Sequence, residues 1–106
     1  MNFDFGAVLA KMLTAMKNVF LADWGNVRAT SEKFMQEHEE SLQRLTDDRL
    51  NKRITEEEYE QYLRDEFTIL EAQIKALKVV RTATTQKAIN AALEVLERAI
   101  KGAITL

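Results

Sequence analysis

The stretch LNKRITEEEY, residues 50–59, ends one helix and begins another. Thr55 and Glu58 have the spacing of a capping box, in which the threonine hydroxyl accepts the Glu58 amide proton and the glutamate reaches back. Ile54 and Tyr59 have the spacing of a hydrophobic staple across the same cap. Asn51 suits the left-handed conformation that often ends a helix. The sequence therefore predicts two helices joined by a turn at residues 51–55.

Apolar residues recur at helical spacing on both sides of this turn. The pattern predicts long helices over about 27–50 and 55–81, and its steps of three and four are typical of a coiled-coil seam. We expect the two helices to pack as an antiparallel hairpin. The outgoing seam is predicted to run through Tyr59, Tyr62, Leu63, Phe67, Leu70, Ile74 and Leu77. The facing pairs are Leu42 with Leu63, Met35 with Leu70, and Val27 with Leu77 or Lys78.

The two ends of the chain carry far less charge than its centre. Residues 27–81, the hairpin arm, hold 13 acidic and 10 basic residues, whereas the other 51 residues hold 4 and 5. We expect apolar terminal helices over about 3–23 and 85–102, with breaks near Gly25 and the threonine-rich segment 82–85. Residues 1–26 and 82–106 would then form an apolar terminal hub within a single helical domain spanning 1–106.

The apolar faces of these terminal helices are too broad for one partner helix to cover. Exposed apolar surface of that extent marks an interaction site, so we expect a second copy to complete a helical bundle as a homodimer or larger assembly. The residues expected at this oligomer interface are Val8, Leu9, Met12, Leu13, Met16, Val19, Phe20, Ile89, Leu93, Leu96 and Ile100.

Composition excludes several classes of function. The chain has no cysteine, which removes thiolate nucleophiles, disulfides and cysteine-based metal sites. It has no proline, which favours long uninterrupted helices. A formal net charge of −2 argues against nucleic acid as a partner, because phosphate binding needs a basic surface. No Walker loop, Gly-x-Gly-x-x-Gly, Gly-x-Ser-x-Gly or His-Glu-x-x-His sequence is present. We therefore expect a protein that is not an enzyme and needs no cofactor.

The apolar N-terminal region raises the question of a membrane. Lys11 and Lys17 interrupt residues 3–24, so the region resembles neither a signal peptide nor a membrane span of about 20 residues. We expect a soluble, cytoplasmic protein. The stripe Met12, Met16 and Phe20, with the two lysines opposite, would also suit a helix lying in a membrane interface, although membrane contact is not the favoured reading.

His38 is the only histidine of the chain. The antiparallel register places it opposite Glu66 and Phe67, and a histidine beside a carboxylate can act as a base or metal ligand. Helical di-iron sites use Glu-x-x-His, but Met35 stands three residues before His38 and no such motif occurs. We expect a structural histidine and no metal site.

These observations predict a non-enzymatic, self-assembling helical module that acts in structure or protein interaction. The first alternative is an amphipathic protein of membrane surfaces or pores. The second is a small oligomeric bundle that binds a metal through His38 and nearby carboxylates.

Overall fold

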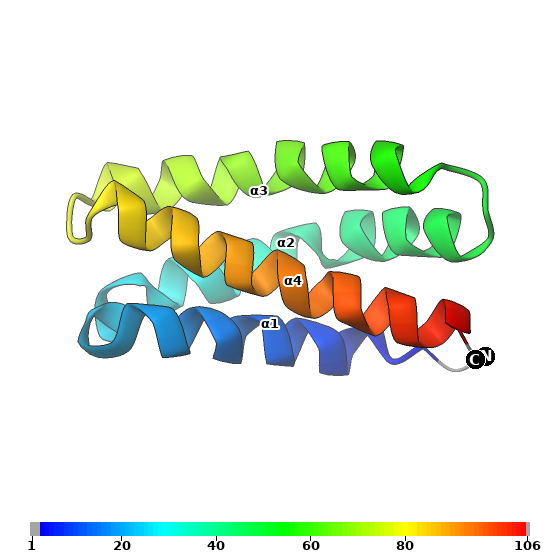
Figure 1. The fold of residues 1–106 in the computed structure, drawn as a ribbon. Helices are drawn as coiled ribbons and strands as arrows, with labels where there is room; N and C mark the ends of the chain where they lie inside the picture. Colours follow the sequence, from blue (N-terminus) through cyan, green and yellow to red (C-terminus); the bar gives the residue numbers. More distant parts are fainter. Residues whose placement is uncertain (1–2, 106) are drawn as a thin grey trace.

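Four α-helices run alternately in opposite directions along one long axis in the computed structural model, which describes residues 3–105 (Figure 1). The predicted all-α class is confirmed. The bundle measures 39 × 22 × 21 Å along its principal axes. The elements are α1 (Phe5–Phe20), a short 3₁₀ turn η1 (Leu21–Asp23), α2 (Trp24–Leu50), α3 (Glu56–Leu77) and α4 (Thr82–Thr105).

The turn between α2 and α3 contains the predicted capping box. The Thr55 hydroxyl accepts from the Glu58 amide at 3.1 Å, and the Thr55 amide donates to the Glu58 carboxylate at 2.9 Å. The prediction for Asn51 is wrong, because its φ is −89° and Lys52 takes the left-handed conformation with φ 59°. The Asn51 side-chain amide donates to the Asp47 carbonyl at 2.8 Å, and the same carbonyl accepts from the Asn51 backbone N–H at 2.9 Å.

The contacts between α2 and α3 follow the antiparallel register that the sequence indicates. The hydroxyls of Thr46 and Tyr59 lie 2.8 Å apart, and the His38 ring faces the Glu66 carboxylate. Two residues of the predicted seam differ from the prediction. Tyr62 and Leu77 are 44% and 40% exposed and lie outside the core.

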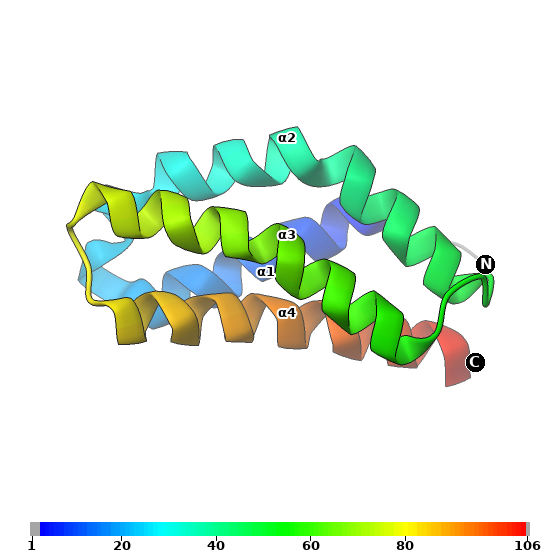
Figure 2. The same ribbon diagram turned by 90° about the horizontal axis from the view of Figure 1, so that it is seen from above.

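The terminal helices do not stand apart from the hairpin as a separate hub. Figures 1 and 2 show α1 and α4 lying alongside α2 and α3, and α4 also packs against α3. One hydrophobic core draws buried residues from all four α-helices. The broad apolar faces of the terminal helices are therefore covered within the chain, because each helix contacts more than one neighbour.

The most extensive helix–helix contact is between α1 and α4. Ala88 and Ala92 of α4 are fully buried, and so are Met12 and Met16 of α1. Small residues on one helix let a neighbouring helix approach, and flexible methionine side chains fill the space that remains.

Both expected helix breaks lie a few residues earlier than predicted. The first is η1, and Gly25 belongs to the first turn of α2. The second spans residues 78–81, after α3 ends at a left-handed Lys78. Thr85 is buried inside α4, where its hydroxyl donates to the Arg81 carbonyl at 3.3 Å. A threonine that bonds back in this way is accommodated within a helix, so the threonine-rich segment does not interrupt it.

Candidate functional site

The eleven residues expected at an oligomer interface lie in or against the core of the single chain. Leu13 and Val19 are half-buried, and the other nine are at most 8% exposed. Burial within the chain accounts for these nine side chains without a second copy. A self-association surface would therefore have to use other faces of α1 and α4.

His38 belongs to a small polar cluster that joins α2 to α3. Its Nδ1 atom lies 3.5 Å from Oε2 of Glu66, and its ring stacks on Phe34 with centroids 4.2 Å apart. The Ser41 hydroxyl donates to Oε1 of the same glutamate. Oε2 of Glu66 is buried and has no hydrogen-bond partner among residues 3–105, so the imidazole of His38 is the side chain that faces it across the α2–α3 interface.

The order of groups in this cluster does not suit nucleophilic catalysis. A serine nucleophile needs a base beside its hydroxyl, with a third group orienting that base. Here the carboxylate of Glu66 lies between Ser41 and His38, so the histidine faces the carboxylate and not the hydroxyl. Within residues 3–105, no group of three or more histidine, aspartate or glutamate side chains is spaced to hold a metal ion. The geometry of His38, Ser41 and Glu66 therefore supports a structural contact between α2 and α3.

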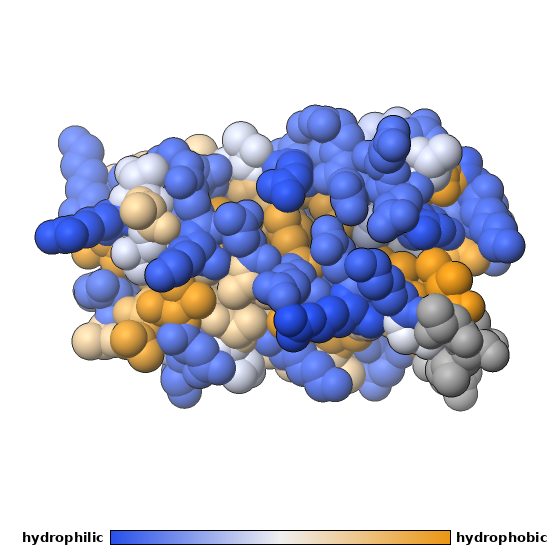
Figure 3. Space-filling view, in the orientation of Figure 1, coloured by the Kyte–Doolittle hydropathy of each residue, from blue (hydrophilic) through white to orange (hydrophobic). Residues whose placement is uncertain are grey.

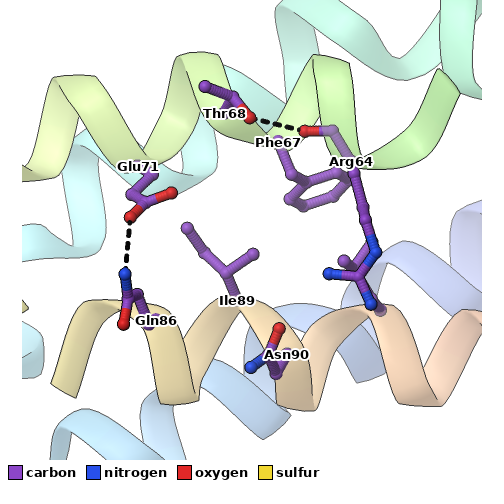
Figure 4. A pocket seen from close by; sticks show the side chains of 8 residues that line it. Arg64, Phe67, Thr68, Glu71, Gln86, Ile89 and Asn90 are labelled. Atoms are coloured by element: carbon purple, nitrogen blue, oxygen red, sulfur yellow. Dashed lines mark hydrogen bonds between the residues drawn. The ribbon is translucent and has the colours of Figure 1, made fainter. Parts of the chain in front are cut away.

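A groove of about 320 Å³ lies between α3 and α4 (Figure 4). Its apolar lining comes from Phe67, Ile89 and Leu93, which are all buried. Arg64 reaches from α3 towards α4, and Asn90 projects from α4 into the same space. No ion pair joins the Arg64 guanidinium to another residue in the described part of the chain. The groove thus combines an apolar floor with an unpaired cation.

The far end of this groove is closed by paired polar groups. Glu71 accepts from Gln86 at 3.4 Å and lies 2.8 Å from Lys75. The hydrogen bond from Lys75 holds the pKa of the Glu71 carboxyl below its usual range. The negative charge of Glu71 is therefore balanced locally, which leaves Arg64 as the unbalanced charge of the groove.

The 3₁₀ turn η1 and the connection 78–81 lie at the same end of the bundle (Figure 1). Three exposed apolar side chains belong to this end. Leu21 is 73% exposed, and Leu77 and Val79 are 40% and 43% exposed. Leu21 also has φ 54° and ψ −119°, a backbone conformation that favours glycine. Its strain and exposure distinguish Leu21 from the other apolar side chains of the bundle.

The same end is strongly basic. Residues 17–28 and 75–87 hold six basic residues and one acidic residue, although the whole chain has a net charge of −2. Four of the basic side chains, Lys17, Lys78, Arg81 and Lys87, are exposed and make no ion pair with any residue in 3–105. Figure 3 shows hydrophobic surface between hydrophilic side chains near this end. We call Leu21, Leu77 and Val79 with these four residues the basic apolar end.

Sequence reasoning missed the basic apolar end because it compared the charge of consecutive segments. Lys17 belongs to a segment of low charge, and Lys78 and Arg81 belong to a segment with an excess of acids. The fold brings them together because η1 and residues 78–81 lie at the same end of an up-and-down bundle. Summing the charges of all predicted helices at each end of the bundle, instead of along consecutive segments, would have detected this cluster.

The hydropathy of the N-terminal helices also bears on a membrane. One 18-residue window within Phe5–Leu50, which includes α1, η1 and α2, has a mean hydropathy of 1.3, and 33% of that window is buried. By length and composition this segment is sufficient to cross a bilayer. Core helices of water-soluble bundles pass the same test, and the apolar side chains of α1 line the core of this bundle.

Comparisons with known proteins gave no relative from which a function could be inferred. No protein-family model matches the chain, and no curated protein or solved structure matches it either.

Proposed function

We propose that this chain is a non-enzymatic helical docking module whose basic apolar end rests on a membrane surface that contains anionic lipids. The observation that carries the proposal is Leu21. Its side chain is 73% exposed and so adds little to the core, and its backbone conformation, which ends α1, disfavours leucine. A strained, exposed apolar residue is a reason to look for a function at that position.

The charges around Leu21 define the kind of surface that the module meets. Each lysine or arginine close to an anionic leaflet contributes roughly 1 kcal/mol of attraction. Lys78 and Arg81 flank Val79 along the chain, and Lys17 precedes Leu21 by one helical turn. Aliphatic side chains would enter the interface while the neighbouring cations meet lipid phosphates. The opposite end, residues 44–60, holds six acidic and four basic residues and would point away from the membrane.

The shape of the basic apolar end favours a bilayer over a folded partner. Two short connections form this end of the bundle, and their aliphatic side chains project from it. A protein partner would need a pocket to receive them, whereas a fluid interface adapts to protruding side chains. A second copy joined end to end would bring like charges together, which costs free energy. The cytoplasm is the compartment we propose, because the cytoplasmic leaflet carries the anionic lipid.

Co-sedimentation with lipid vesicles tests this function. We expect binding to vesicles of phosphatidylcholine with phosphatidylserine and much weaker binding to phosphatidylcholine alone. Salt should weaken the binding, because the Debye length falls from about 10 Å at 0.1 M to about 3 Å at 1 M. Leu21→Asp should abolish it. The matched control is Ile69→Asp, since Ile69 is 45% exposed on α3 away from this end and should leave binding unchanged. Equal loss in both variants, or no binding to anionic vesicles, would contradict the proposal.

Self-association is a second candidate, supported by the outward face of α1. Ala7, Ala10 and Thr14 are exposed there beside the half-buried Leu13, and small residues allow a second helix to approach closely. Sedimentation equilibrium at micromolar concentration would detect a homodimer, and Ala10→Glu should dissociate it. A monomer in the parent protein would remove this candidate and leave the membrane proposal intact.

A further inference from the structure

We infer that the groove between α3 and α4 binds a small organic carboxylate with an apolar body, the carboxylate pairing with Arg64 and the body lying on Phe67, Ile89 and Leu93. This inference is independent of the basic apolar end. It rests on the unpaired guanidinium, the buried apolar floor and the balanced charge at the opposite end of the groove.

The size of the groove limits the ligand to a small molecule. Its volume of about 320 Å³ is at the lower end of the range for ligand pockets. It is roughly twice the ~150 Å³ cavity that accommodates benzene in a protein core. One aromatic ring with a short carboxylate arm therefore fits within the groove, whereas a nucleotide or long acyl chain would extend beyond it into solvent.

The polar groups select the charge of the ligand. The planar guanidinium of Arg64 can donate two parallel hydrogen bonds to a carboxylate. The carboxamide of Asn90 has no hydrogen-bond partner among the described residues and lines the same groove, so its N–H groups are free to donate to the ligand. Glu71 is occupied by Lys75 and Gln86. An organic cation would meet the uncompensated Arg64, so the groove disfavours it.

The floor selects an apolar body. Phe67 is 1% exposed, and Ile89 and Leu93 are 7% exposed, so these side chains are fixed by the core beneath them. A preformed apolar floor does not have to be ordered when a ligand binds, which lowers the entropic cost of binding. A ligand of about ten non-hydrogen atoms on such an open site should bind with a dissociation constant near 1 mM.

Three ligands of matched shape and different charge test the inference: phenylacetate, 2-phenylethanol and 2-phenylethylamine. Amide chemical shifts of the full chain, followed by NMR during titration, report binding at Phe67, Ile89 and Leu93. We expect saturable shifts there with phenylacetate, at least about tenfold weaker binding of the alcohol, and no saturation with the amine. Equal binding of the acid and the alcohol would overturn the inference, as would the absence of saturation by phenylacetate at about 10 mM.

Substitutions distinguish a built site from adventitious contact. Arg64→Gln should weaken phenylacetate binding about tenfold, and Arg64→Lys should weaken it less, because the charge remains while the planar donor fork is lost. Arg98→Gln is the matched control, since Arg98 is an exposed arginine of α4 that pairs with Glu94 outside the groove. Unchanged amide dispersion in each variant shows that the bundle is folded. An equal effect of Arg64→Gln and Arg98→Gln would contradict the role of Arg64.

Discussion

The backbone N–H of Leu21 donates to the carbonyl of Lys17, which ends α1 while the Leu21 side chain remains 73% exposed. Positive φ costs an L-residue about 1–2 kcal/mol, and glycine largely escapes this cost. Glycine also raises the entropy of the unfolded chain, which offsets part of the gain. We predict that Leu21→Gly raises the free energy of unfolding by up to about 1 kcal/mol, measured by urea denaturation, and that it weakens vesicle binding.

Leu21→Ala provides the control for this effect. Alanine keeps the side-chain clash of positive φ but removes most of the apolar surface. It should weaken vesicle binding without the gain in stability. A Leu21→Gly protein that is less stable than the parent would mean that the leucine side chain supports the bundle.

The hydroxyl of Tyr59 lies 2.8 Å from the hydroxyl of Thr46, and both residues are buried. Thr46 donates its own proton to the Leu42 carbonyl, so Tyr59 is the donor between the two. Burial raises the pKa of Tyr59 above its ordinary value near 10, although the hydrogen bond with Thr46 opposes the shift. The raised pKa means that the neutral phenol stabilises the fold below pH 10 and that this stability is lost as the pH rises further.

We therefore predict two effects of Tyr59→Phe on unfolding by urea. At neutral pH the variant should be about 1 kcal/mol less stable, because one buried hydrogen bond is lost. Above about pH 10 the difference from the parent should shrink, because the Tyr59 phenol then ionises in the unfolded parent while it stays protonated in the folded parent. Tyr62→Phe, on an exposed tyrosine of the same helix, should change neither quantity. A difference that stays constant with pH would contradict the account of Tyr59.

His38 should be a structural residue of the α2–α3 interface. His38→Leu removes the imidazole that faces Glu66 but keeps an apolar group against Phe34. We expect a folded variant whose free energy of unfolding falls by about 1 kcal/mol or less, because the contact is partly exposed to solvent. Metal analysis of the parent protein should find no stoichiometric zinc or iron. Bound metal that disappears in His38→Leu would make the metal-binding alternative the better account.

Local features of the fold follow from short stretches of sequence. The capping box depends on Thr55 and Glu58 alone, and the register of α2 against α3 follows from the position of the turn. The packing of α1 and α4 against the hairpin could not be predicted in this way. Periodicity indicates how much apolar surface a helix must bury. It does not indicate whether the helices that bury this surface belong to the same chain or to a second copy.

The candidate sites were less accessible to sequence reasoning. The register placed His38 opposite Glu66, which the structure shows. The groove at Arg64 depends on how α3 and α4 separate, and helix spacing is set by side-chain packing along the whole bundle. The strain at Leu21 was hidden for another reason. A leucine after a periodic apolar stretch resembles a core residue, and its positive φ is visible only in the structure.

The fluorescence of Trp24 tests the docking proposal most directly, because this is the only tryptophan of the chain and lies at the basic apolar end. Its indole stacks on Phe20 with centroids 6.3 Å apart and is partly exposed. Brominated phosphatidylcholine mixed with phosphatidylserine quenches an indole that enters the interface. Lys78 and Lys52 provide a matched pair, since both are exposed lysines with left-handed φ, 57° and 59°, in connections at opposite ends of the bundle. We predict strong quenching of the parent and of Lys52→Glu, and a marked loss of quenching in Lys78→Glu. Equal quenching of the two variants, or none in the parent, would contradict the account.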